Sequence, residues 1–210
     1  KAYFKQYVDE FFSSIKADDT EKLYNALNGI RRIISRNSGD SLNTLLYDAK
    51  ILPTIATLLD EKFKDYSKVQ FEAAWIITNL AGGEPSDTNY CVNTLHAIER
   101  FIKILNRPVP LDPNQVDNFE NLETGIKQLL VLQLNLAFNR EKAVWALCNL
   151  SGDSDVNRDK CLQYDLMDNV LAILSGASIR PTHLRNFLWL VSNLCRGKPY
   201  PPFDEVIREY

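Results

Sequence analysis

The chain has 210 residues, of which 45% are apolar and 24% charged, the balance of a protein that folds around a substantial core. Its 24 basic and 27 acidic residues give a net charge of -3, which favours cationic ligands over nucleic acid. No apolar run reaches the roughly 18 residues of a membrane span and no signal peptide opens the chain, so we expect neither membrane nor nucleic-acid binding.

The first predicted unit consists of two helices. One covers residues 7–15, and Asp19 then caps the start of a longer helix over residues 21–36, which Gly39 ends. This unit carries no tryptophan.

A second unit follows with three helical segments. Residues 41–50 and 51–63 are short and lead into the apolar run FEAAWIITNL at 71–80. Residues 81–96 and 97–107 then begin a third unit with the same order of short helix and second helix.

The third unit holds an insertion, which we place at residues 107–137. Its first part, VPLDPNQVDNFEN, contains two prolines and several Asn and Asp residues, which are typical of a solvent loop. Its second part is rich in leucine, has neither Pro nor Gly after Gly125, and predicts an N-terminal extension of the helix over 141–150. This extension either packs on its own solenoid or forms a docking surface for another protein.

The fourth unit repeats the order once more. A short helical segment at 151–165 and a second helix at 166–176 precede the apolar run LRNFLWLVSNL at 184–194. Trp145 and Trp189 are 44 residues apart. Repeats of about 40 to 47 residues with three helices each favour an armadillo solenoid.

Every tryptophan in the chain lies four residues before an asparagine, inside an apolar helical run. Residues four apart share one face of a helix, so each pair presents an indole beside an amide. The pairs are Trp75 with Asn79, Trp145 with Asn149, and Trp189 with Asn193. Apolar residues fall on the opposite side of the first two helices: Ala73, Ile77, Leu80 and Ala81, then Ala143, Leu147 and Leu150. The tryptophans should therefore point away from the core.

No pattern indicates a metal, a cofactor or catalysis. The four cysteines are too widely spaced for a zinc or redox motif, and the two histidines are solitary; these residues are Cys91, Cys148, Cys161, Cys195, His96 and His183. We find no nucleophile with a neighbouring base and no Gly-rich phosphate loop, so we predict that the chain is not an enzyme.

The segments QFEAAWIITNLAGG, AVWALCNLSGD and LRNFLWLVSNLCRGKPYPPFDEV resemble the second, third and fourth armadillo repeats of importin-α, the adaptor that recognises nuclear localisation signals. The resemblance implies an all-α, right-handed solenoid of three-helix units. Residues 1–210 would form one solenoid segment of about four repeats and the start of a fifth. It also implies a protein that moves between cytoplasm and nucleus.

In this family a basic peptide lies extended along the concave groove. The asparagine amides bond its backbone, and the stems of its lysines lie between neighbouring indoles, with a cation–π component of about 0.5–1 kcal/mol. The most selective pocket takes one ammonium group, and the matching positions here are Asp153, Gly83 and Thr88. One carboxylate, one carbonyl and one hydroxyl satisfy the three donors of a lysine.

Further positions match or depart from the family. Asn186 and Arg196 match residues that line the groove, whereas Lys142 stands where the family has glutamine, so we expect it to repel a nearby ligand lysine. The resemblance also implies importin-β as a partner of full-length members, but the basic segment that recruits it and the family's second binding site have no counterpart in this sequence. The alternative interpretation is a general armadillo scaffold that binds another partner through its groove or its insertion.

Overall fold

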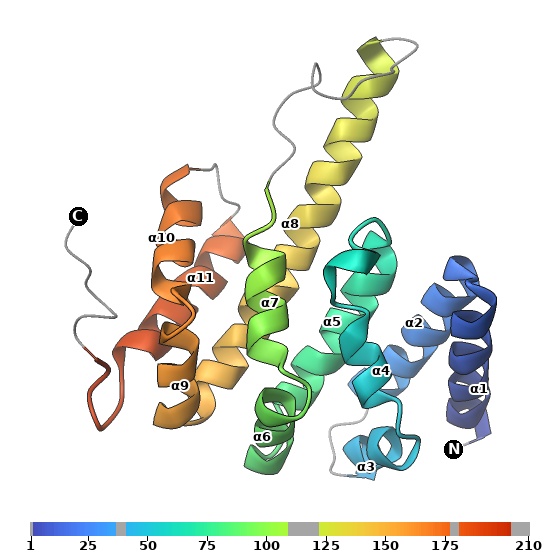
Figure 1. The fold of residues 1–210 in the computed structure, drawn as a ribbon, viewed down its shortest axis with the longest axis horizontal. Coiled ribbons are helices and arrows are strands. Elements are labelled where there is room, and N and C mark those ends of the chain that lie inside the picture. The colour runs from blue at the N-terminus through green and yellow to red at the C-terminus, as the bar shows by residue number, and fades with distance from the viewer. Residues whose placement is uncertain (1, 37–40, 109–121, 177–180, 203–210) are drawn as a thin grey trace.

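The computed structural model describes residues 2–36, 41–108, 122–176 and 181–202, with the backbone alone at 36, 41–42, 122–135, 176 and 182–183. The described residues are helical, without strands (Figure 1). In chain order the helices are α1 (Ala2–Ala17), α2 (Thr20–Arg36), α3 (Ser41–Asp48), α4 (Leu52–Thr57), the 3-10 turn η1 (Glu61–Phe63), α5 (Ser67–Ala81), α6 (Pro85–Asn93), α7 (Ala97–Leu105), α8 (Leu122–Asp153), α9 (Asp155–Leu162), α10 (Leu166–Gly176) and α11 (Pro181–Cys195).

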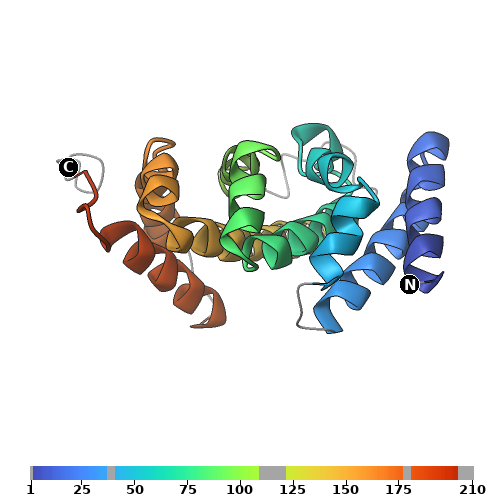
Figure 2. The ribbon, with the colours of Figure 1, turned by 90° about the horizontal axis from the view of Figure 1, so that it is seen from below.

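The helices form an elongated stack of similar units. Helices α2, α5, α8 and α11 pack one against the next, and the shorter helices of each unit pack against them. Figure 2 shows these four helices as a continuous row, with α1 at one end of the array and α11 towards the other. A row of long third helices covered by shorter ones is the armadillo arrangement that the repeat spacing predicts.

Local signals set several helix ends. The backbone N–H of Lys22 donates to Asp19 Oδ1 at 3.1 Å, so Asp19 caps α2 as predicted. Ser154 does the same for α9 by accepting from the N–H of Asn157 at 3.3 Å. Helix α1 is longer than the predicted segment at both ends. The predicted stop at Gly39 lies outside the described residues.

The insertion contributes the first part of a long helix. Helix α8 has 32 residues, so the leucine-rich segment does extend the helix of Trp145 at its N-terminal end. Figure 1 shows that this end of α8 projects beyond the neighbouring helices. The predicted loop at 109–121 lies outside the described residues. No helix in the described part of the chain is long and apolar enough to cross a membrane.

One apolar core runs through the described units. The residues predicted to lie opposite the tryptophans are buried: Ala73, Ile77, Leu80, Ala143, Leu147 and Leu150 are 0% exposed and Ala81 is 3% exposed. The helical period therefore predicted correctly which faces of α5 and α8 are inside.

Polar contacts between units repeat with the same spacing. On α6, the carboxylate of Asp87 accepts from Asn43 Nδ2 at 2.6 Å and from Tyr47 Oη at 2.7 Å, both on α3. Burial, then the bond to this carboxylate, raises the pKa of Tyr47. Such charge-assisted bonds fix the stacking of one unit on the next.

Three of the four cysteines are buried, and all four are free thiols. Burial raises the pKa of Cys91 and of Cys148 to about 12, and it raises the pKa of Cys161 as well. Because the thiolate is the reactive form, these three should resist modification. We expect a thiol-specific disulfide reagent at pH 8 to modify one thiol per folded chain, at the exposed Cys195, and four in denaturant. Rapid modification of a folded Cys195→Ser variant would contradict this.

Candidate functional site

The three tryptophans lie on consecutive long helices of the row, on faces turned away from the core. Trp75 on α5 and Trp145 on α8 are half-buried, and Trp189 on α11 is 43% exposed. The predicted outward orientation of the indoles is confirmed. An indole with an accessible face can hold an aliphatic stem and attract a cation.

The paired asparagines tie each long helix to the one before it. Asn79 Nδ2 donates to Ser35 Oγ at 2.9 Å, Asn149 Nδ2 donates to the carbonyl of Thr78 at 3.1 Å, and Asn193 Nδ2 donates to the carbonyl of Cys148 at 2.9 Å. Thr78 lies in the last turn of α5 and its carbonyl also accepts from the N–H of Gly82 at 3.1 Å, and Cys148 lies about one turn before the end of α8. The amides of the three Trp-Asn pairs thus have a role in stacking the helices that the sequence did not predict.

Two glycines make room for these amides. A Cβ at Gly82 would lie 3.0 Å from Asn149 Nδ2, and a Cβ at Gly152 would lie 2.9 Å from Asn193 Nδ2. Gly82 follows Asn79 by three residues, and Gly152 follows Asn149 by three. This Asn-x-x-Gly spacing is a sequence signal that could have revealed the stacking contact.

Lys142 is buried between aromatic rings. Its side chain is on α8, it is 6% exposed, and its Nζ lies 4.1 Å from the ring centroid of Trp75 and 4.6 Å from that of Trp145. Phe71 is a third ring, at 5.6 Å. Burial lowers the pKa of Lys142. This lysine therefore does not stand in a solvated groove, because the gap between α5 and α8 takes in almost all of its side chain.

A second cation of the chain lies over Trp75. The guanidinium carbon of Arg31, on α2, is 4.1 Å from the indole centroid. Arg31 also forms an ion pair with Glu72, which is 3% exposed and accepts from Asn28 Nδ2 at 2.8 Å. Arg31 lies 44 residues before Trp75, so it occupies the tryptophan position of the first unit. The sequence interpretation missed it because that position does not hold tryptophan.

The residues of the expected ammonium pocket lie at the C-terminal ends of α5 and α8 and on α6. Asp153 is exposed at the end of α8 and accepts from Asn157 Nδ2 at 3.2 Å. Gly83 is exposed, whereas Thr88 is 1% exposed and its hydroxyl donates to the carbonyl of Ala81 at 3.2 Å. Within the described part of the chain, these three residues form no hydrogen bond or ion pair with one another. Their joint action on a ligand stays a prediction.

A cavity of about 300 Å³ lies beside Asp153, between the ends of α8 and α11. Asn193 and Arg196 line it, and Asn193 Oδ1 is buried and reached by no donor in the described part of the chain. The carbonyl of Arg196 accepts from the buried Arg158 guanidinium at 2.8 Å, which holds the segment after α11 in place. The remaining predicted residue, Asn186, is half-buried on α11.

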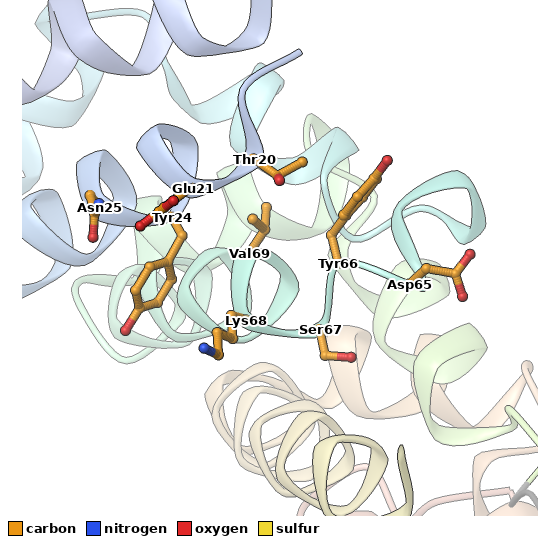
Figure 3. A pocket seen from close by; sticks show the side chains of 9 residues that line it. All are labelled: Thr20, Glu21, Tyr24, Asn25, Asp65, Tyr66, Ser67, Lys68 and Val69. Atoms are coloured by element: carbon orange, nitrogen blue, oxygen red, sulfur yellow. The ribbon is translucent and has the colours of Figure 1, made fainter. Parts of the chain in front are cut away.

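A separate pocket of about 420 Å³ lies at the N-terminal ends of α2 and α5 (Figure 3). Its lining residues are Thr20, Glu21, Tyr24, Asn25, Asp65, Tyr66, Ser67, Lys68 and Val69. None of the predicted site residues is among them. The candidate site is therefore the face that carries the three indoles, together with the helix ends around Asp153.

Comparison with known proteins finds importin-α subunits. No protein-family model matches the chain. Importin subunit alpha-2 of Arabidopsis thaliana is 31% identical over 190 residues, which make up 90% of this chain and 30% of the relative. Importin subunit alpha-6 of the same plant is 28% identical over 198 residues, with 94% of this chain and 31% of the relative covered. The chain thus spans about a third of the length of these relatives.

A solved structure supports the fold independently. An engineered protein superposes with a TM-score of 0.52 at 18% identity, over 91% of this chain and 81% of its own. At that identity the likeness concerns the fold alone. The relatives that match by sequence are importin subunits rather than enzymes. Over about 90% of its length, this armadillo-repeat chain is therefore an importin-α homologue.

Proposed function

We propose that this chain is a signal-binding segment of a nuclear import adaptor. It binds lysine- and arginine-rich nuclear localisation signals in extended form along the face of α5, α8 and α11, and accompanies its cargo between cytoplasm and nucleus. The observation that carries the proposal is the row of indoles at Trp75, Trp145 and Trp189, each partly accessible, in an importin-α homologue.

The chemistry of this face suits an extended basic peptide. Side chains of an extended chain alternate, and each residue advances it by about 3.3 Å, so alternate stems can reach the row of indoles. Asn79 and Asn149 are half-buried, and each uses one amide hydrogen for stacking. The second amide hydrogen and the carbonyl oxygen of each can then bond the backbone of the peptide.

Asp153 supplies the preference for positive charge. Its carboxylate is exposed at the end of α8, where a lysine ammonium can approach it. We assign the carbonyl of Gly83 and the hydroxyl of Thr88 to the same ammonium. Although Thr88 already donates to Ala81, its oxygen keeps lone pairs for an incoming donor.

Charge reversal at Asp153 tests this assignment. Asp153→Lys should weaken binding of a Lys/Arg-rich peptide about tenfold or more, because a charge-assisted bond of about 1.5–3 kcal/mol is replaced by repulsion. Isothermal titration calorimetry measures the affinity. Asp9→Lys, at an exposed carboxylate on α1, makes the same change of charge and should leave binding unchanged. Equal weakening by both variants, or no binding by the unmodified chain, contradicts the proposal.

A second candidate function follows from the shape of α8. Its N-terminal part projects beyond the row of helices, as a docking element for a different partner would (Figure 1). On this alternative the chain is a general armadillo scaffold. Basic peptides should then bind no better than neutral peptides of equal length, and deletion of about residues 108–130 should abolish capture of the partner.

A further inference from the structure

The chain's own cations fill part of the row of indoles. Two of them lie 4.1 Å from the ring centroid of Trp75: the guanidinium carbon of Arg31 and the ammonium of Lys142. Arg31 is on α2 and Lys142 on α8, the helices that pack against α5 on either side (Figure 1). This distance is well within the roughly 6 Å at which a ring attracts a cation. Both cations that lie over this indole thus belong to the chain itself.

The slot between Trp75 and Trp145 is closed to a ligand cation. The Lys142 ammonium lies within 5 Å of both ring centroids, at 4.1 Å and 4.6 Å, and its side chain is 6% exposed. A second ammonium in this slot would meet a like charge already placed within 5 Å of both rings. Lys142 therefore occupies the position that a ligand lysine would take between these two rings.

The slot between Trp145 and Trp189, unlike the one between Trp75 and Trp145, holds no cation of the described residues. Trp189 is 43% exposed, and no cation is recorded over its ring within the described residues. The exposed Asp153 carboxylate lies at the C-terminal end of α8, one of the two helices that carry these indoles, and the cavity beside it is also lined by the basic side chains of Arg158, Arg196 and Lys198. A ligand cation thus finds a ring at Trp189 that no cation of the described residues covers.

We propose that the face of this chain offers one open slot for a ligand's lysine or arginine, between Trp145 and Trp189, because Arg31 and Lys142 fill the positions on either side of Trp75. This inference rests on the proposed function and narrows its ligands. The open slot selects peptides with one basic residue at the position that lies between Trp145 and Trp189. The peptide residue two positions away faces Lys142 and does not need to be charged.

The test compares two peptides that are otherwise uncharged, one with a single lysine and one with two lysines at alternate positions. For the unmodified chain we expect the second lysine to change affinity less than about twofold. For Lys142→Gln, which removes the positive charge from the slot between Trp75 and Trp145, the two-lysine peptide should bind about fivefold tighter than the one-lysine peptide. NMR titration of the indole N–H resonances gives both affinity and place. The unmodified chain should respond at Trp145 and Trp189, and the variant at Trp75 as well.

Controls separate the slot from general charge effects. Lys68→Gln removes an exposed lysine that lies 5.9 Å from the Tyr24 ring, and it should behave as the unmodified chain. Lys142→Ala removes the side chain beyond Cβ at a helical position and should reproduce Lys142→Gln. If the unmodified chain already gains fivefold from the second lysine, the inference is wrong and the proposed function stands. If no version binds either peptide, the proposed function fails and the inference fails with it.

Discussion

Glu72→Gln is expected to lower the free energy of unfolding by about 3 kcal/mol, because it leaves buried positive charge without its carboxylate. Glu72 is 3% exposed and pairs with Arg31, whose side chain is 14% exposed. Glutamine keeps an oxygen for the bond from Asn28 but removes the negative charge. The nearby Lys142 makes the loss larger, since this carboxylate also stabilises its charged form. Urea denaturation measures the change.

Two further variants identify charge as the cause. Glu61→Gln removes a carboxylate that is 61% exposed and pairs with Lys64 and Arg107, and exposed pairs of this kind contribute less than about 1 kcal/mol. Adding Lys142→Gln to Glu72→Gln should recover about 1 kcal/mol, because one of the two cations beside Trp75 is then gone. If Glu72→Gln lowers the free energy of unfolding no more than Glu61→Gln does, the buried Arg31–Glu72 pair does not stabilise the fold.

The sequence predicted the features that depend on helical period. Apolar residues three and four apart identified the buried faces of α5 and α8, and with them the outward direction of Trp75 and Trp145. The repeat spacing predicted the stacked three-helix units. These properties follow from neighbours on one helix, so a single sequence contains them.

The sequence could not place side chains that fill the space between helices. Lys142 is polar and one turn before Trp145, which suits a solvated groove as well as a buried slot. Its location depends on the gap between α5 and α8 and on the rings of Phe71 and Trp75 that border it. These distances arise from stacking, and no periodic pattern within α8 contains them.

Other contacts follow the repeat spacing but change residue type. Arg31 and Ser35 lie 44 residues before Trp75 and Asn79, and each contacts its counterpart. A search for repeated Trp-Asn pairs overlooks them, because the first unit uses different residues for the same positions. Aligning all units by position rather than by tryptophan would have found both.

Gly152→Ala should destabilise the folded chain when Asn193 is present and stabilise it when Asn193 is absent. The added Cβ would lie 2.9 Å from Asn193 Nδ2, so the amide must move away from the carbonyl of Cys148. Because Asn193 is 2% exposed, the lost bond costs about 1–3 kcal/mol, more than the up to about 1 kcal/mol that alanine gains over glycine in a helix. We therefore expect a net loss of about 2 kcal/mol in urea denaturation.

In an Asn193→Ala background the same methyl group meets no amide, and the preference of α8 for alanine should dominate. Gly152→Ala should then raise stability by about 0.5 kcal/mol. The reversal of sign in this double-mutant cycle distinguishes a stacking contact from a requirement for glycine at the end of the helix, since a backbone requirement would give a loss in both backgrounds. Asn193, which pairs with Trp189 on α11, would thereby also determine which residue α8 can hold at position 152, three positions after Asn149.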